Sequence, residues 1–220
     1  MKNAAPDNIL SQLSDLGVSH ETVGRLELYH EILVKWQSTI NLISNQTLHH
    51  IWSRHILDSI QLLPHLENNS GAILDIGSGA GFPGMALAIS GVKNIHLIES
   101  DTKKITFLKE VARITNTEVA IHNTRIEMFH VNQKAGVILS RAVTSLDEIL
   151  SLCESFVSHE TKCLFHKGKN WSKEMEEAKK NFQFDEEIIP SLTEPEAVIV
   201  KLSHIVRRNH DPKLSLGHQP

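Results

Sequence analysis

The sequence predicts a doubly wound α/β fold, in which a mostly parallel sheet carries helices on both faces. Three features of the 220 residues indicate it. A short isoleucine-rich run, Ile73–Ile76, enters a loop with glycine at every second position, which is typical of a buried strand leading into a ligand-binding turn. Apolar strand patterns then alternate with helical patterns along the chain. Two β-like runs at the end have no helix between them, so we expect them to pair antiparallel.

Three helical patterns precede the first strand, and we assign residues 1–70 to an N-terminal helical cap. Apolar residues recur at helical spacing over 7–16, 21–40 and 49–66. The segment Arg54-His-Ile-Leu-Asp-Ser59 lies within the third pattern, and its polar side chains are interpreted as the solvated side of a helix. Because no strand interrupts these helices, they stand outside the sheet alternation.

The elements of the sheet domain, residues 71–203, follow in order. The predicted strands cover 73–76, 95–98, 119–121, 136–139, 163–165, 185–189 and 197–202. The predicted helices cover 83–90, 102–115, 146–156 and 171–180. Pro83 suits the first turn of its helix, and Asp101 can cap the next one. The basic residues of helix 102–115, Lys104 among them, are interpreted as a solvated face, with an RNA-facing patch as the less favoured alternative. Residues 204–220 form a basic tail that we expect to be mobile.

Composition and charge narrow the class of protein. The longest apolar runs are far shorter than the roughly 20 residues that span a bilayer, and the N-terminus lacks an apolar signal core, so we expect a cytoplasmic protein with no membrane partner. The 14 histidines show no metal-ligand spacing, so we expect no metal, and we place Cys153 and Cys163 in the core. A net charge of -4 does not indicate nucleic acid binding, although a local basic patch can still attract a polyanion. No feature of the sequence requires more than a monomer.

The glycine loop has the pattern D-x-G-x-G-x-G, formed by Asp75, Gly77, Gly79 and Gly81. The dinucleotide fingerprint G-x-G-x-x-G does not fit, because Phe82 stands at its third glycine, and a phosphate P-loop does not fit, because no G-K-[ST] follows. The pattern resembles motif I of the Rossmann-like S-adenosylmethionine methyltransferases. The resemblance implies S-adenosyl-L-methionine as the cofactor and a class I methyltransferase fold, with a mostly parallel seven-stranded sheet and a terminal antiparallel hairpin.

Two charged residues stand where predicted strands end. Glu99 ends the second strand about twenty residues after the glycine loop, where an acid can accept hydrogen bonds from a ribose diol. Arg141 ends the fourth strand, at the position that faces the reacting methyl group in this fold class. Because an unpaired buried cation is costly, Arg141 needs a partner: Glu127, the carboxylate of the cofactor, or a substrate phosphate.

A more specific resemblance rests on five segments taken together. They are Arg54-His-Ile-Leu-Asp-Ser59, Asp75-Ile-Gly-Ser-Gly-Ala-Gly-Phe-Pro-Gly84, Thr124-Arg-Ile-Glu127, Ser140-Arg-Ala142 and Lys167-Gly168. In their order and spacing the chain resembles the bacterial small-subunit (16S) ribosomal RNA guanine-N7 methyltransferases, the glucose-inhibited division protein B family. The similarity runs from about residue 36 to residue 201. The histidine-rich composition and the tail after residue 202 depart from the family.

This resemblance implies a set of site residues and a partner. The implied cofactor-binding residues are Gly77, Gly79, Gly81, Phe82, Glu99, Ile126, Glu127 and Arg141. The basic residues implied to position the RNA are Arg125, Arg141 and Lys167. The implied partner is small-subunit ribosomal RNA or the assembling 30S particle.

The expected chemistry is direct in-line transfer of the methyl group from the cofactor to N7 of a specific guanine. N7 carries a lone pair and no proton, so we expect no general base and no catalytic nucleophile. Two other functions stay open: a small-molecule methyltransferase with the same cofactor, and a ribosome-assembly factor without catalysis. A nicotinamide dehydrogenase conflicts with Phe82 and with the terminal hairpin.

Overall fold

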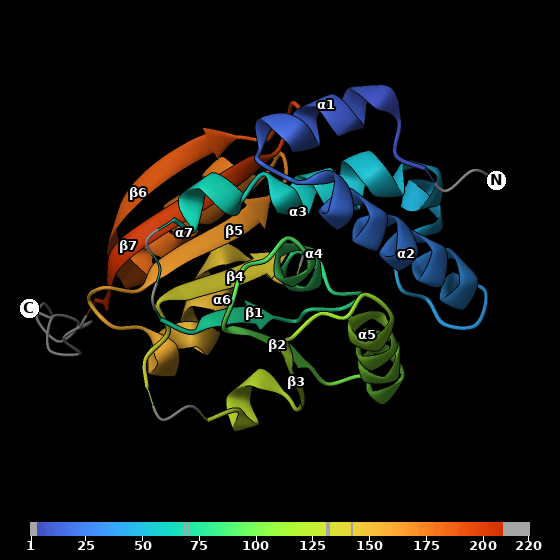
Figure 1. The fold of residues 1–220 in the computed structure, drawn as a ribbon. Coiled ribbons are helices and arrows are strands. Elements are labelled where there is room, and N and C mark those ends of the chain that lie inside the picture. Colours follow the sequence, from blue (N-terminus) through green and yellow to red (C-terminus); the bar gives the residue numbers. More distant parts are fainter. Residues whose placement is uncertain (1–3, 68, 70, 131–132, 142, 209–220) are drawn as a thin grey trace, which may run out of the picture.

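A computed structural model describes residues 4–67, 69, 71–130, 133–141 and 143–208 of the chain. Its centre is a seven-stranded sheet with the strand order β3-β2-β1-β4-β5-β7-β6 (Figure 1). The strands are β1 (Ile73–Ile76), β2 (Ile95–Glu99), β3 (Ala120–Asn123), β4 (Val137–Arg141), β5 (Lys162–Lys167), β6 (Phe182–Pro190) and β7 (Val198–Arg207). Strands β1 to β5 run parallel, whereas β7 is antiparallel to both β5 and β6. The predicted fold, including the terminal antiparallel hairpin, is confirmed.

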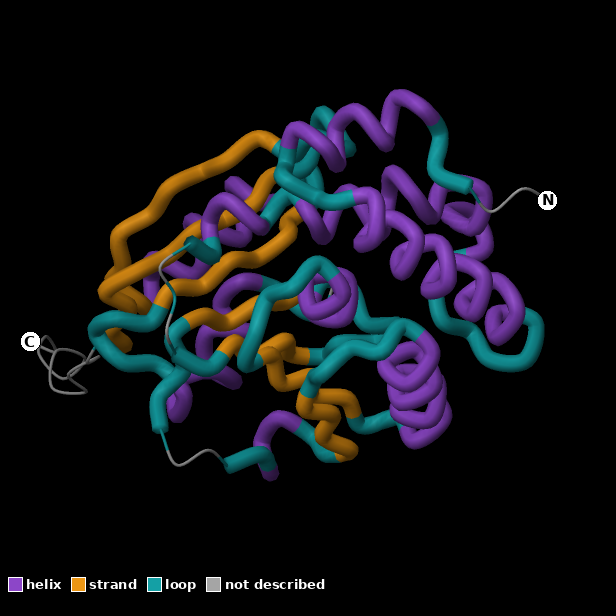
Figure 2. The backbone as a smooth tube through the Cα atoms, in the orientation of Figure 1, coloured by secondary structure: helices purple, strands orange, loops and turns teal. Residues whose placement is uncertain are grey.

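Helices cover both faces of this sheet (Figure 2). They are α1 (Asp7–Asp15), α2 (His20–Gln37), α3 (Asp58–Ile60), α4 (Gly84–Ile89), α5 (Thr102–Ile114), α6 (Leu146–Cys153) and α7 (Trp171–Asn181). Asp101 caps α5 as predicted, because its carboxylate accepts hydrogen bonds from the backbone N–H groups of Lys103 and Lys104. Pro83 is the residue before α4 rather than its first residue.

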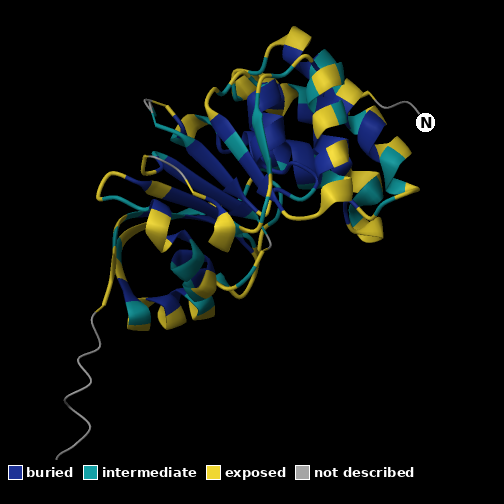
Figure 3. Cartoon of the chain, turned by 90° about the horizontal axis from the view of Figure 1, so that it is seen from below, coloured by how far each residue is buried: buried dark blue, intermediate teal, exposed yellow. Residues whose placement is uncertain are grey.

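Two apolar cores lie on the two faces of the sheet. One joins the N-terminal helices to α4 and α5 through side chains such as Leu26, Ile56 and Phe107. The other lies under α6 and α7 and contains both cysteines, which are buried and free as predicted. Figure 3 shows the buried strands between helices whose outer turns are exposed. Because the first core is shared, the N-terminal helices pack directly on the part of the sheet that carries the glycine loop.

The third predicted helix, 49–66, is broken into short turns of different pitch. The chain forms the 3-10 turn η1 (Asn45–His50), the π-helical turn η2 (Trp52–Leu57), α3 and the 3-10 turn η3 (Leu63–His65). Within η2 and α3, His55 and Ser59 are buried, and the Ser59 hydroxyl donates to the His55 carbonyl at 2.7 Å. The prediction that residues 54–59 form the solvated side of a helix is therefore wrong. A π-helical turn is often found where backbone geometry serves a site.

The last strand also departs from the sequence-based expectation. β7 continues to Arg207, past the expected start of the mobile tail at residue 204. Residues 209–220 of that tail lie outside the described residues. Among the helices that are described, none is long and apolar enough to cross a membrane.

Candidate cofactor and RNA site

The glycine loop starts where β1 ends and owes its shape to positive backbone φ angles. Gly79 has φ +57°, and a Cβ added there would meet no heavy atom closer than the Gly77 carbonyl oxygen at 3.8 Å. Gly81 has φ +93°, and a Cβ there would lie 2.6 Å from Met85 Cβ and 2.8 Å from Tyr29 Oη. The glycine at 79 therefore keeps the backbone open to a ligand, whereas the glycine at 81 lets α2 and α4 close on the loop.

Two carboxylates hold this loop through its backbone. Asp75 is fully buried, and its Oδ2 accepts from the Gly84 N–H at 3.0 Å, which fixes the start of α4. Burial raises the pKa of Asp75 to about 7, against the opposing effects of the Gly84 hydrogen bond and Arg141. Glu99 accepts from the Gly79 N–H at 2.9 Å, and its other oxygen accepts from the N–H groups of Ser100 and Asp101. A carboxylate has about four lone-pair sites, so Glu99 keeps capacity for a ligand hydroxyl.

A cavity of about 540 Å³ opens beside the loop. Its volume falls in the range of small-molecule sites, and its open backbone at Gly79 suits an extended cofactor, so the residues present fit S-adenosylmethionine. Six predicted site residues line it, namely Gly77, Gly79, Phe82, Glu99, Arg141 and Lys167. Four predicted site residues do not line it, namely Gly81, Arg125, Ile126 and Glu127. The last three sit on the loop after β3, which the Thr124 N–H joins to the Glu99 carbonyl at 3.0 Å.

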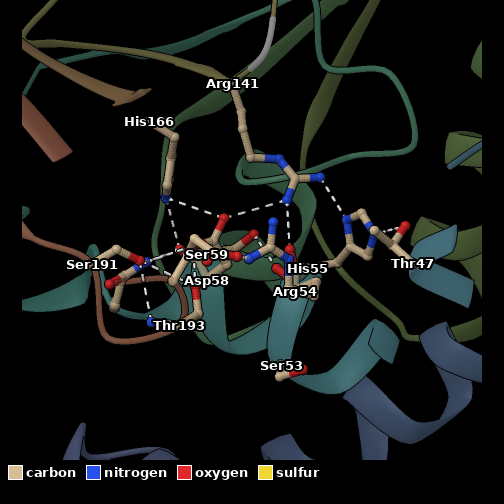
Figure 4. A network of polar contacts seen from close by, with 12 residues as sticks. Thr47, Ser53, Arg54, His55, Asp58, Ser59, Arg141, His166, Ser191 and Thr193 are labelled. Carbon is tan, nitrogen blue, oxygen red and sulfur yellow. Dashed lines mark hydrogen bonds and ion pairs between the residues drawn. The ribbon is translucent and has the colours of Figure 1, made fainter. Parts of the chain in front are cut away.

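Arg141 enters the cavity from the end of β4 and is held by the segment before the sheet (Figure 4). Its Nη1 donates to the Arg54 carbonyl at 2.9 Å and lies 3.4 Å from Asp58 Oδ2. Its Nη2 donates to His55 Nδ1 at 2.7 Å. The ion-pair partner of Arg141 within the described residues is thus Asp58. The Glu127 alternative is wrong for the described residues.

The tautomer of His55 follows from these contacts. Burial and the charge of Arg141 lower the pKa of His55 to about 3, so its ring is neutral at physiological pH. A guanidinium only donates, so Nδ1 accepts from Arg141, and Nε2 carries the proton and donates to Thr47 Oγ1 at 2.8 Å. The His55 ring also lies 5.1 Å from the Phe82 ring, over which the Arg141 guanidinium sits at 5.3 Å.

Asp58 connects Arg141 to two further segments. Its Oδ1 accepts from Thr193 Oγ1 at 2.7 Å, and its backbone carbonyl accepts from His166 Nε2 at 2.7 Å (Figure 4). The loop of residues 191–197, between β6 and β7, is also joined to Gln61, whose Oε1 accepts from the Leu192 N–H at 2.8 Å. Sequence reasoning missed Asp58 and His55. The sequence feature that could have indicated them is the group of polar residues at 53–55 and 58–59 within an otherwise apolar helical stretch.

The basic residues that line the cavity differ in their pairing. Lys167 donates to Glu174 Oε2 at 2.8 Å and to the Thr144 carbonyl at 2.7 Å. Arg54 pairs with Glu194. Lys104 also lines the cavity, and no partner of its ammonium is found in the described parts of the chain. Lys104 thus lies at the cavity, on the helix whose charges were interpreted as a solvated face.

Comparison with known proteins identifies the family. The family model of rRNA small subunit methyltransferase G (GidB) matches residues 22–200. The chain belongs to this family. The ribosomal RNA small subunit methyltransferase G of Paramagnetospirillum magneticum is 41% identical over 200 residues, which is 91% of this chain and 97% of that protein. The protein of the same name from Granulibacter bethesdensis is 42% identical over 191 residues, 87% of this chain and 89% of that protein.

A solved structure supports the fold independently. A glycopeptide N-methyltransferase complexed with S-adenosyl-L-homocysteine superposes with a TM-score of 0.55 at 8% identity, over 67% of this chain and 88% of that one. Together with the family, this fold confirms the predicted enzyme class and cofactor. The chain is an S-adenosylmethionine-dependent methyltransferase of the rRNA small subunit methyltransferase G family.

Proposed function

We propose that the methyl group passes directly from the sulfonium of S-adenosylmethionine to N7 of one guanine in 16S ribosomal RNA, without a general base. The observation that carries this proposal is the position of Arg141. It stands at the end of β4, in the cavity beside the glycine loop, and three acceptors fix its guanidinium. A fixed guanidinium can present paired N–H groups to the O6 edge of guanine or to a phosphate.

The acids of the cavity support transfer without a base, because each is engaged. Asp58 faces Arg141 and Thr193, and Glu99 accepts from three backbone N–H groups. Glu174 pairs with Lys167, and Glu194 pairs with Arg54. N7 needs no proton removed, so the residues only have to orient the base and exclude water. Such positioning is worth roughly 7–11 kcal/mol in well-oriented reactions.

The cofactor roles follow from the same geometry. We propose that the open backbone at Gly79 and the Phe82 side chain receive the cofactor, and that Glu99 binds a ribose hydroxyl through the remaining lone pair of the carboxylate. Gly77 lines the cavity beside Gly79, and Gly81 allows Met85 and Tyr29 to pack against the loop. Ile126 and Glu127 follow Thr124, which is tied to Glu99, so they are proposed to contact the adenine side. Bound cofactor supplies an electrophilic methyl group at this edge of the sheet.

The substrate side is proposed to use Arg125 and Arg141 directly and Lys167 as a residue that positions the surrounding chain. Lys167 is mostly buried and paired, so its role is to hold Glu174 and the loop at Thr144 rather than to contact RNA from the surface. Arg125 is exposed and is available to a phosphate. We propose that the enzyme acts as a monomer in the cytoplasm, on small-subunit ribosomal RNA or the assembling 30S particle, where the target guanine is accessible and unpaired.

Transcripts in which 7-deazaguanosine replaces guanosine test the proposal. The deaza base keeps its Watson–Crick edge but lacks the N7 lone pair. We expect the protein to methylate normal small-subunit RNA from cells that lack the gene and to transfer nothing to the deaza RNA. Continued transfer to the deaza RNA would place the methyl on another atom and refute the N7 assignment.

A further inference from the structure

The ion pairs at the cavity differ in how firmly they are enclosed. Arg141 and Asp58 have side chains only 18% and 14% exposed, and Lys167 and Glu174 are 9% and 27% exposed. Arg54 and Glu194 are 37% and 40% exposed, and both line the cavity. An exposed ion pair contributes little stability and can exchange partners, whereas separating a buried pair leaves a charge uncompensated. Arg54 is therefore the paired cation of this cavity that is free to take another anion.

We propose that Arg54 binds a phosphate of the ribosomal RNA close to the target guanine, and that Glu194 takes the place of this phosphate when RNA is absent. The proposal deepens the proposed function, because it takes the RNA bound at this site as the ligand. A guanidinium binds carboxylate and phosphate with the same bidentate geometry, so the Glu194 carboxylate and an RNA phosphate compete for the same N–H groups of Arg54.

The position of Arg54 supports a contact near the reacting base. Its backbone carbonyl accepts from Arg141 Nη1 at 2.9 Å, so the two residues are neighbours at the cavity. A phosphate held by Arg54 is thus bound next to the guanidinium that faces the target base. The chain has a net charge of -4, so such a local cation is needed to attract a polyanion.

The loop that carries Glu194 is fixed independently of Arg54. Thr193 donates to Asp58 at 2.7 Å, and the Leu192 N–H donates to Gln61 at 2.8 Å. Figure 4 shows Ser191 and Thr193 against Asp58. Because these contacts do not involve Arg54, a phosphate can displace the Glu194 carboxylate while the loop stays in place. Glu194 then also selects against weak anions, since a ligand has to compete with it.

The test measures binding of small-subunit RNA to Glu194→Gln, Arg54→Gln and the double variant over a series of salt concentrations. Glu196→Gln is the matched control, because Glu196 lies in the same loop, is exposed and is in no ion pair among the described residues. Arg113→Gln is the control for Arg54, since it removes another exposed ion pair, with Glu110, that lies outside the cavity. Thermal unfolding and calorimetry with S-adenosylmethionine verify that each variant is folded.

We expect Glu194→Gln to bind RNA about two- to fivefold more tightly, which corresponds to release of an exposed ion pair. Arg54→Gln weakens binding about tenfold and makes the negative slope of log affinity against log salt shallower by about 0.7–0.9, the value for one phosphate contact. In the Arg54→Gln background the effect of Glu194→Gln disappears. Neither control reproduces these changes.

Three results would overturn the phosphate site. They are an equal gain for Glu194→Gln and Glu196→Gln, a gain that persists without Arg54, and an unchanged salt slope for Arg54→Gln. Each would mean that Glu194 acts only through its negative charge, or that the Arg54–Glu194 pair is an ordinary surface contact. Because this assay measures binding without methyl transfer, its failure is distinct from failure of the N7 assignment, which the deaza RNA tests.

Discussion

The two walls of the cavity are built in different ways. The cofactor wall is one continuous segment, 75–84, which backbone hydrogen bonds to Asp75 and Glu99 hold in shape. The opposite wall is assembled from side chains of four segments that are far apart in the chain, at residues 47–61, at Arg141, at His166 and in the loop 191–197. The first wall is local and repeats a pattern of the fold class. The second wall exists only when distant parts of the fold meet.

Because the second wall depends on contacts between distant segments, we expect the loss of a single side chain to have its largest effect there. Asp58→Ala removes the acceptor shared by Arg141 and Thr193 and leaves the mostly enclosed guanidinium without its counter-ion. We expect unfolding free energy to fall by about 3–5 kcal/mol and methyl transfer to fall by at least a hundredfold, as measured by urea denaturation and single-turnover transfer. Asp185→Ala, on the exposed part of β6, is the control and should leave both near the wild-type values. A fully active Asp58→Ala enzyme would show that Arg141 needs no fixed orientation.

Within the first wall, two neighbouring glycines should separate packing from ligand access. Gly81→Ala forces a Cβ to within 2.6 Å of Met85 Cβ, whereas the Cβ of Gly79→Ala comes no closer than 3.8 Å to any heavy atom. Both substitutions carry the backbone cost of positive φ, about 1–2 kcal/mol. We therefore expect Gly81→Ala to lose clearly more thermal stability, and Gly79→Ala to lose mainly affinity for S-adenosylmethionine in calorimetry. Equal losses of stability would contradict the different roles of the two positions.

The N-terminal helices contribute to the first wall through one residue. Tyr29 on α2 is fully buried, donates to the Ala80 carbonyl and stacks on Phe82 with ring centroids 5.1 Å apart. Tyr29→Phe keeps the ring and leaves that buried carbonyl without its donor, which costs about 1–3 kcal/mol. We expect lower stability together with several-fold weaker cofactor binding. Unchanged cofactor binding would mean that α2 supports the fold without shaping the loop.

The two walls should also respond to pH with opposite sign. The pKa of His55, about 3, lies below its ordinary value of 6.5, so between these values only the unfolded chain binds the proton. The contribution of His55 to stability is complete above 6.5 and is lost as pH falls towards 3. The pKa of Asp75, about 7, lies above its ordinary value of 3.8, so the folded chain holds the proton and stability falls as pH rises through this window.

Substitution separates these contributions. Between about pH 4 and 6.5, His55→Gln should make the slope of unfolding free energy against pH less positive, and Asp75→Asn should make it more positive. The limit for one proton is about 1.4 kcal/mol per pH unit. Urea denaturation at a series of pH values measures both slopes. If the two substitutions shift the slope in the same direction, at least one of the two pKa shifts is assigned the wrong sign.

Sequence alone predicted the parts that depend on local pattern. The seven strands, the hairpin and the Asp101 cap follow from periodicity and from residues with fixed local roles. The family followed from five segments, and the comparisons confirm it. The partner of Arg141 could not be predicted, because Asp58 precedes it by 83 residues and starts α3 directly after a π-helical turn that a 3.6-residue period does not describe. The position of Lys104 at the cavity could not be predicted, because the sequence of a charged helix does not show which of its exposed residues face a cavity.

The central claim is that Arg141 acts through a fixed orientation and not through charge alone. Arg141→Lys keeps the charge but cannot reproduce contacts with the Arg54 carbonyl, Asp58 and His55 at once. The most direct measurement is single-turnover methyl transfer to small-subunit RNA by this variant at saturating cofactor. The account predicts a rate about a hundredfold below wild type with the protein still folded. A rate equal to wild type would contradict it.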